Sequence, residues 1–337
     1  MLRRSPAARG AVAALALLLA CSVPQPAQAA YELVKAYEGS SFFDGWQFYG
    51  HYDNLTNGDV DYVTASGGKD LAYINDAGNA IIKVDNTTSL VYPNKRRIFP
   101  RLHHFQIRVT DAKNRPQYPI GTLIIHDVLH LPYGCSVWPS LWTSAPNWPQ
   151  GGEIDILEGV NLQQENRMAL HTSPGCTASS SSTSAAFTGE LTYSNCDAYA
   201  NANSGCGVTE ENTAPSYGAD FGARGGGIWA TELGKDGIRI WFFPRSAVPA
   251  TLLTSNSSSP PDISTFPTPS AFYPSSSCNT PDFFAPQHLV ITLTLCGDWA
   301  GNTAVLAQTG CPLKSGSPTC YDSYVLECLL QLRRRLL

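Results

Sequence analysis

Short hydrophobic runs separated by turn-forming residues recur from Tyr31 to about residue 295. Runs of this length, bounded by Gly, Asn, Asp, Ser and Pro, are typical of β-strands. No stretch of this region has a helical period of useful length. The predicted strands are 71–74, 80–84, 105–109, 122–131, 152–158, 167–172, 227–233, 237–243 and 288–295. The pattern therefore predicts an all-β protein.

Composition supports the same fold class. Charged residues make up only 15% of the chain, whereas Gly (28) and Pro (24) are plentiful, as in turn-rich β proteins. We expect one β-sandwich of two antiparallel sheets, a jelly roll, over residues 31–322. Two stretches rich in Ser or in Ser and Pro, 177–186 and 255–282, are predicted to be surface loops.

One predicted strand carries an unusual set of charges. The segment GGEIDILEG at 151–159 places Glu153, Asp155 and Glu158 among apolar residues, where ionised carboxylates are costly to bury. Side chains two apart share a face of a strand, so Glu153 and Asp155 point the same way. Glu158 is five residues from Glu153, and regular alternation sends it to the other face. One extra residue, a β-bulge, returns it to the first face.

Three carboxylates on one face suit glycoside hydrolysis. A retaining enzyme holds two carboxyl groups about 5–5.5 Å apart, one as nucleophile and one as acid/base. We assign these roles to Glu153 and Glu158. Asp155, between them, disfavours ionisation of a neighbour, which helps to keep Glu158 protonated, and it is placed to orient the nucleophile. A calcium site and a solvated outer face are the alternatives for the same pattern.

Tryptophans close to these acids favour a carbohydrate site. Trp138, Trp142 and Trp148 lie just upstream, and flat sugar rings stack on aromatic faces. Core packing is the alternative for each, and it is weakest for Trp148, whose loop leads directly into the acid strand. His171, on the next predicted strand, either contacts Glu158 or the sugar, or is structural.

The first 30 residues and the net charge predict where the protein acts and which partners it lacks. Two arginines, an apolar core over 11–20 and a small-residue end at 27–29 form a secretory signal peptide, 1–30. A membrane anchor is the alternative, but the apolar core is too short to span a bilayer comfortably. We therefore expect a secreted, extracellular monomer that has no membrane association after signal removal. A net charge of −5 with no basic stripe argues against nucleic acid as a partner.

Ten cysteines predict disulfides in an oxidising compartment. Cys21 leaves with the signal peptide, and nine remain. No CxxC pair exists, so we expect no zinc site. Cys311 and Cys320 flank a short loop and are predicted to pair. Three glycosylation sequons begin at Asn54, Asn86 and Asn256.

These motifs together resemble a known family. The segments at 127–161 (DVLHLPYGCSVWPSLWTSAPNWPQGGEIDILEGVN), 167–176 (RMALHTSPGC) and 295–301 (LCGDWAG) are similar to glycoside hydrolase family 16, and more narrowly to fungal laminarinase-like endo-1,3(4)-β-glucanases. The segment 42–63 is similar to the N-terminal region of that family. The resemblance covers about 31–322, with gaps.

The resemblance implies a concanavalin A-like jelly roll with an open cleft. It also implies a retaining mechanism that needs no cofactor or metal, and a β-glucan polysaccharide as partner. Glu153 matches the nucleophile, Glu158 the acid/base and Asp155 the assisting carboxylate. The positions that match substrate contacts are Trp148, Trp299, His171 and Arg108.

Two departures from the family pattern stand out. The segment from 96 to 108, which contains IFPRLHHF, is longer than in the family, and we hypothesise an insertion from a gene-model error such as a retained intron. The end YVLECLLQLRRRLL reads as a short basic helix where the family has a strand, so 323–337 is treated as an atypical tail. Without Cys328, eight mature cysteines remain, an even number.

Three functions fit the sequence. The first is a secreted endo-β-glucanase that hydrolyses 1,3-linked or mixed 1,3/1,4-linked β-glucan. The second is a cell-wall transglycosylase, which uses the same covalent intermediate with a different acceptor. The third is a non-catalytic glucan-binding lectin, which does not need all three acids.

Overall fold

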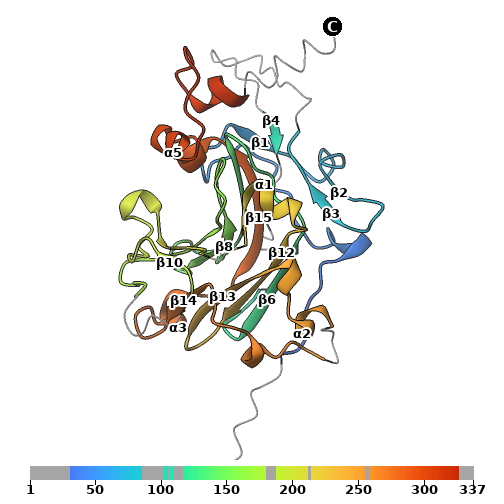
Figure 1. Cartoon of the computed structure of the whole chain (residues 1–337), viewed down its shortest axis with the longest axis vertical. Coiled ribbons are helices and arrows are strands. Elements are labelled where there is room, and N and C mark those ends of the chain that lie inside the picture. Colours follow the sequence, from blue (N-terminus) through green and yellow to red (C-terminus); the bar gives the residue numbers. More distant parts are fainter. Residues whose placement is uncertain are drawn as a thin grey trace, which may run out of the picture. The chain divides into compact units, whose positions relative to one another are not determined.

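Two antiparallel sheets form most of the structure (Figure 1). The computed structural model describes residues 31–85, 102–104, 106–108, 117–179, 187–211, 214–254 and 259–325. The predicted signal peptide, Asn86, Asn256, Cys328 and, within 96–108, residues 96–101 and 105 lie outside these residues. Within them, one sheet has the strand order β10-β11-β9-β8-β7-β15-β5 and the other β14-β13-β12-β6. The predicted two-sheet sandwich is confirmed.

The strands of the larger sheet are β5 (Gln106–Arg108), β7 (Val137–Ser144), β8 (Glu153–Glu158), β9 (Arg167–His171), β10 (Glu190–Leu191), β11 (Cys206–Thr209) and β15 (His288–Leu295). Those of the smaller sheet are β6 (Thr122–Val128), β12 (Gly227–Leu233), β13 (Gly237–Pro244) and β14 (Ala271–Pro274). Two small pairs join β1 (Val60–Tyr62) to β4 (Leu102–His104) in parallel and β2 (Ala72–Ile74) to β3 (Ala80–Ile82) in antiparallel.

Helices are short and lie in the connections. They are α1 (Gly218–Ala223), α2 (Ala250–Leu253), α3 (Thr280–Phe283), α4 (Gly297–Ala300) and α5 (Thr303–Gln308). Single turns are η1 (Gly39–Ser41), η2 (Asn201–Asn203), η3 (Arg245–Ala247), η4 (Ile263–Thr265) and η5 (Tyr321–Val325). No helix in the described ranges has the length and apolarity needed to cross a bilayer.

The main core lies between the two sheets. Ile154 and Leu170 of the larger sheet pack in one cluster with Trp229, Ile240 and Phe242 of the smaller sheet. Strand alternation explains this arrangement, since residues on one face of β8 and β9 are apolar and those on the other face carry the acids. The acid-bearing face is therefore the face of the larger sheet that points away from this core.

Two sequence predictions need correction. The stretch 255–282 is not wholly a loop, because it contains β14, whose Ala271 and Tyr273 are buried in the core. The strand β7 was not predicted, because Pro139 lies in its middle and proline is unusual in a central strand. Here Pro139 pairs with Leu293 of β15, and β7 lies between β15 and β8.

The cysteine pairing also differs from the prediction. Cys311 bonds Cys135 and Cys320 bonds Cys296, so Cys311 and Cys320 do not pair. The reason is topological: β7 and β15 are neighbours with Val137 opposite Leu295, which brings Cys135 and Cys296 to the same end of this strand pair. Both bonds therefore tie the segment 311–320 to that end of β7 and β15. The other two disulfides are Cys176–Cys278 and Cys196–Cys206, so the eight predicted cysteines are all paired.

Gly152 enters the acid strand in a conformation that favours glycine. Its φ is +74°, and a Cβ there would collide with the ring of Phe284 and lie 2.8 Å from the carbonyl oxygen of Phe283. Gly78 has a similar φ of +81° but no atom within 4 Å of an added Cβ.

We expect Gly78→Ala to lower the free energy of unfolding by about 1–2 kcal/mol through backbone strain alone. Gly152→Ala is expected to lower it by about 2–4 kcal/mol, because a steric cost is added. Denaturant unfolding of the two variants checks this, and equal losses would exclude the steric contribution.

Candidate functional site

A β-bulge in β8 brings the three carboxylates to one face, as the sequence predicts. Ser140 and Ser144 of β7 pair with Glu158 and Glu153, so four steps on β7 face five steps on β8. The register shifts between Leu141, opposite Leu157, and Trp142, opposite Asp155. Ile156 and Leu157 are both fully buried in the core. Two successive residues thus point inward, and Glu158 returns to the face of Glu153 and Asp155.

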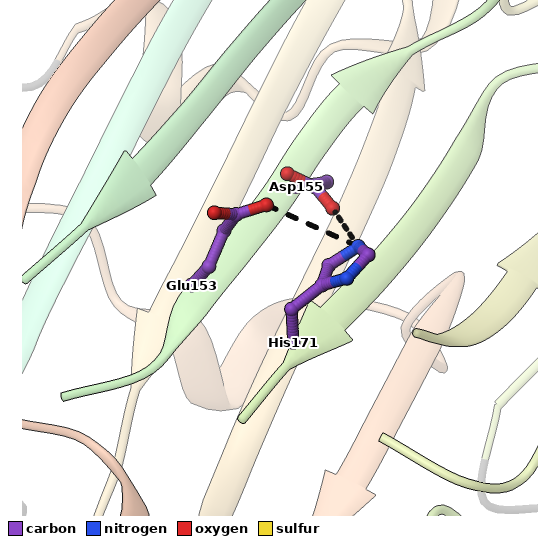
Figure 2. A group of neighbouring side chains, drawn as sticks. All are labelled: Glu153, Asp155 and His171. Atoms are coloured by element: carbon purple, nitrogen blue, oxygen red, sulfur yellow. Dashed lines mark ion pairs between the residues drawn. The ribbon is translucent and has the colours of Figure 1, made fainter. Parts of the chain in front are cut away.

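His171 of β9 lies against two of these acids (Figure 2). Its Nε2 is 3.0 Å from Oδ2 of Asp155 and 3.9 Å from Oε1 of Glu153. The strand register explains the contact, because His171 is paired directly with Glu153. The partners of His171 are therefore Asp155 and Glu153, whereas the sequence had left Glu158 or the sugar as its contact. The side chain of His171 is 7% exposed and belongs to the acid cluster.

Glu158 lies among aromatic side chains. The indole Nε1 of Trp138 donates to Oε1 of Glu158 at 2.7 Å. The ring of Trp299 meets that of Trp138 edge-on, with centroids 5.7 Å apart. The guanidinium of Arg167 lies 5.7 Å from the Trp299 ring. Trp138 therefore packs in a core cluster and also contacts the acid, and its contact with a sugar stays a prediction.

Burial and the charge of Asp155 change the proton affinity of Glu153 and Glu158. Burial raises the pKa of both Glu153 and Glu158, and the charge of Asp155 raises it further. Burial lowers the pKa of His171, but contacts with Asp155 and Glu153 outweigh it and raise the pKa to about 9. His171 is then a cation at neutral pH, with one N–H directed at Asp155. The arrangement can hold one carboxyl group protonated beside an ionised one, which acid/base chemistry requires.

Asp155→Asn and His171→Gln should move the pH profile in opposite directions. Removing the charge of Asp155 removes repulsion, so the paired Glu153 and Glu158 lose their shared proton at lower pH. We expect the alkaline limb of the profile of kcat/KM against pH to move down by about one pH unit. Removing the imidazolium of His171 disfavours the ionised acids, and the limb should move up. Shifts in the same direction would contradict this account of the cluster.

The other predicted residues lie in different elements around the acid strand. Trp148 is 39% exposed in the loop before β8, and a hydrogen bond from its side chain to Glu153 lowers the pKa of that acid. Trp142 is opposite Asp155, and its Nε1 donates to Oγ1 of Thr292 at 2.9 Å. The backbone of Arg108 pairs with Val290 of β15. That register places Arg108 three strands from Asp155, about 14 Å away.

Sequence reasoning missed the partner of His171 on its other side. Asn203 lies 2.9 Å from Nδ1 of His171 through its Oδ1. It belongs to η2, in which Asn201, Ala202 and Asn203 all have positive φ. The disulfide Cys196–Cys206 closes this loop. The sequence offers only asparagine, a residue that tolerates this conformation, as a signal, and nothing that links the loop to His171.

Glu153, Asp155 and His171 also form a group that has the geometry to hold a divalent cation. One ligand atom from each lies within 4.8 Å of the others. Carboxylate and imidazole ligands suit several divalent metals. A cation there would take one carboxylate oxygen of Glu153, and His171 would have to be neutral to bind it.

A two-sheet sandwich with a bulged strand of paired acids, beside indole groups, defines the class of carbohydrate-active β-sandwich proteins. Residues 46–328 match the family model described as the XgeA-like catalytic domain of glycoside hydrolase family 16. The chain belongs to this family.

Relatives and solved structures agree with that assignment. A Schizosaccharomyces pombe protein named as a probable glycosidase is 39% identical over 84% of this chain and 62% of its own length. The endo-1,3(4)-β-glucanase xgeA of Emericella nidulans is 34% identical over 94% of this chain and 47% of its own. The chain therefore spans about half the length of these curated relatives.

Among solved structures, the family 16 Laminarinase 16A of Phanerochaete chrysosporium is 35% identical, with a TM-score of 0.74 over 88% of this chain and 93% of the other. That structure holds two β-glucans, 6-O-glucosyl-laminaritriose, in donor and acceptor sites. An elongating family 16 β-1,3-glucosyltransferase is 34% identical, with a TM-score of 0.72 over 87% of this chain and 91% of the other.

Proposed function

We propose that this protein is a secreted endo-β-glucanase that hydrolyses 1,3-linked and mixed 1,3/1,4-linked β-glucan with retention of configuration. The observation that carries the proposal is the bulge in β8, which brings Glu153, Asp155 and Glu158 to one face of the sheet. The two outer acids provide the pair that a double displacement needs. The names of the relatives and the glucans held by Laminarinase 16A support β-glucan as the substrate class.

In the proposed first step, a carboxylate oxygen of Glu153 attacks the anomeric carbon. The bond to the leaving oxygen breaks, and that oxygen takes the proton of Glu158. In the second step Glu158 takes a proton from water, whose oxygen displaces Glu153 and releases the sugar with its original configuration. The imidazolium of His171, 3.9 Å from Glu153, favours the ionised nucleophile. Burial raises the pKa of both carboxyl groups, so the pair retains a proton, which the proposed mechanism places on Glu158.

The direct test measures reducing sugar released from laminarin and from barley β-glucan, with purified secreted protein. Activity on either substrate supports the proposal, and the ratio between them gives the linkage preference. Proton NMR of the first product tests retention, since the β-anomer must form before mutarotation. A folded protein without activity on both glucans would overturn the proposal, and binding to insoluble glucan would then favour the lectin function.

Transglycosylation is the second candidate, and the similarity to the elongating β-1,3-glucosyltransferase favours it specifically. The same glycosyl-enzyme intermediate serves both reactions, and only the acceptor differs. Chromatography of products from a laminari-oligosaccharide separates the two functions. Products longer than the substrate indicate transfer, whereas exclusively shorter products indicate hydrolysis.

A further inference from the structure

On one side of the bulge between Glu153 and Glu158, β8 has no neighbouring strand to bond its backbone. β8 pairs with β9 at Glu153, Ile154 and Asp155, where the register ends. From Ile156 to Glu158 the strand therefore has no partner residues in β9, although it still pairs with β7 at Leu157 and Glu158. Buried backbone groups without partners are costly. Something other than β9 must satisfy the backbone that sets the position of Glu158.

The side chain of Asn166 takes the place of the missing strand. Its Nδ2 donates to the carbonyl oxygen of Ile156 at 2.9 Å, and its Oδ1 accepts from the backbone N–H of Glu158 at 2.7 Å. One amide group thus bonds the two peptide groups on either side of Leu157, as a neighbouring strand would. Asn166 is fully buried. Among side chains, only Asn and Gln combine an amide donor and acceptor in this way.

Asn166 is itself held in place through its backbone. Its N–H donates to Oγ of Ser216 at 2.7 Å, and its carbonyl oxygen accepts from the N–H of Glu210 at 2.9 Å. Ser216 is 1% exposed. These contacts fix the backbone from which the amide group reaches the bulge. A rigid support of this kind is what keeps a reactive group within a fraction of an ångström of its position.

We propose that Asn166 is a positioning residue that fixes the bulge and hence the location of the Glu158 carboxyl group relative to Glu153. This inference rests on the proposed function, because it assigns Glu158 the acid/base role. Asn166 touches no reacting atom and acts through the backbone of Glu158. A displacement of about 1 Å between catalytic groups costs roughly 10²-fold in rate.

The test compares Asn166→Ala and Asn166→Asp with wild type and with Gln163→Ala. Gln163 is the matched control, because its Oε1 accepts from the N–H of Val160 at 2.8 Å and so supports backbone just beyond the bulge. Asn166→Asp keeps the acceptor for Glu158, but it replaces the donor to Ile156 by a carboxylate oxygen, which repels that carbonyl oxygen. Each variant is assayed on laminarin and on 2,4-dinitrophenyl β-laminaribioside, with and without sodium azide, and its thermal midpoint is recorded.

For Asn166→Ala we expect kcat on laminarin to fall about 10²-fold with KM within about threefold. Asn166→Asp should show an intermediate loss, and Gln163→Ala a near-normal kcat. Release of dinitrophenol in the first step should be largely spared, because this leaving group needs little acid. Azide needs no general base: its nitrogen attacks the anomeric carbon, the bond to Glu153 breaks, and a β-glycosyl azide forms. Azide should therefore raise the turnover of the dinitrophenyl substrate by Asn166→Ala and leave that of the wild type unchanged.

The outcomes separate the two claims. A folded wild type that is inactive on both substrates overturns the proposed function, and with it this role of Asn166. If the wild type is active, two results with folded Asn166→Ala overturn the positioning role alone. One is an unchanged kcat. The other is an equal loss of activity on both substrates that azide does not restore. If Asn166→Ala does not fold, the same criteria applied to Asn166→Asp decide.

Discussion

Replacement of Glu153 by glutamine is expected to abolish β-glucan hydrolysis while leaving the fold intact. The amide is close in size to the carboxylate but is a far weaker nucleophile, so the covalent intermediate cannot form at a useful rate. Loss of a nucleophile typically costs roughly 10⁴–10⁶-fold in kcat. Reducing-sugar release from laminarin at high enzyme concentration measures a loss of this size.

The matched control for this variant is Glu165→Gln, because Glu165 is an exposed carboxylate in the connection between β8 and β9. It undergoes the same chemical change close to the site, and we expect activity within about twofold of wild type, as for an ordinary surface substitution. Removal of the buried like charge should also raise the thermal midpoint of Glu153→Gln slightly, since burial and Asp155 both disfavour the ionised acid. A Glu153→Gln protein with normal turnover would exclude Glu153 as the nucleophile.

The bulge in β8 could be predicted because the sequence violates strand alternation in a costly way. Glu158 five residues after Glu153 would put an acid in the core, and one extra residue removes this cost. The structure shows the extra residue and two successive inward side chains, Ile156 and Leu157. The hydrophobic pattern likewise located the nine strands that have enough apolar residues to stand out.

Other features depend on which strands are neighbours, and local sequence does not contain that information. The partner of Cys311 is Cys135, 176 residues away, and it is near only because β7 pairs with β15. β7 itself has a proline that locally argues against a central strand. Asn203 reaches His171 because a loop folds over β9, and Asn166 bonds β8 because β9 separates from it. Tertiary contacts decide all four features.

Replacement of Glu158 by alanine should give a different loss from that of Glu153, one that depends on the leaving group. On laminarin, whose leaving group is a poor sugar alkoxide, we expect kcat to fall about 10²–10⁴-fold because the general acid is absent. On 2,4-dinitrophenyl β-laminaribioside the first step should proceed at close to the wild-type rate. The intermediate then accumulates, because no base activates water, and dinitrophenol appears as a burst that stopped-flow absorbance measures.

Azide supplies the decisive control, since it attacks the intermediate without a base. We expect it to restore turnover of the aryl substrate by Glu158→Ala and to yield a β-glycosyl azide, and to restore nothing in Glu153→Gln, where no intermediate exists. Burial and the neighbouring Asp155 raise the pKa of Glu158, so the wild-type alkaline limb should vanish from the aryl-substrate profile of the alanine variant. If Glu158→Ala lost activity equally on both substrates and azide had no effect, Glu158 would not be the acid/base. The nucleophile and acid roles on β8 would then have to be reassigned.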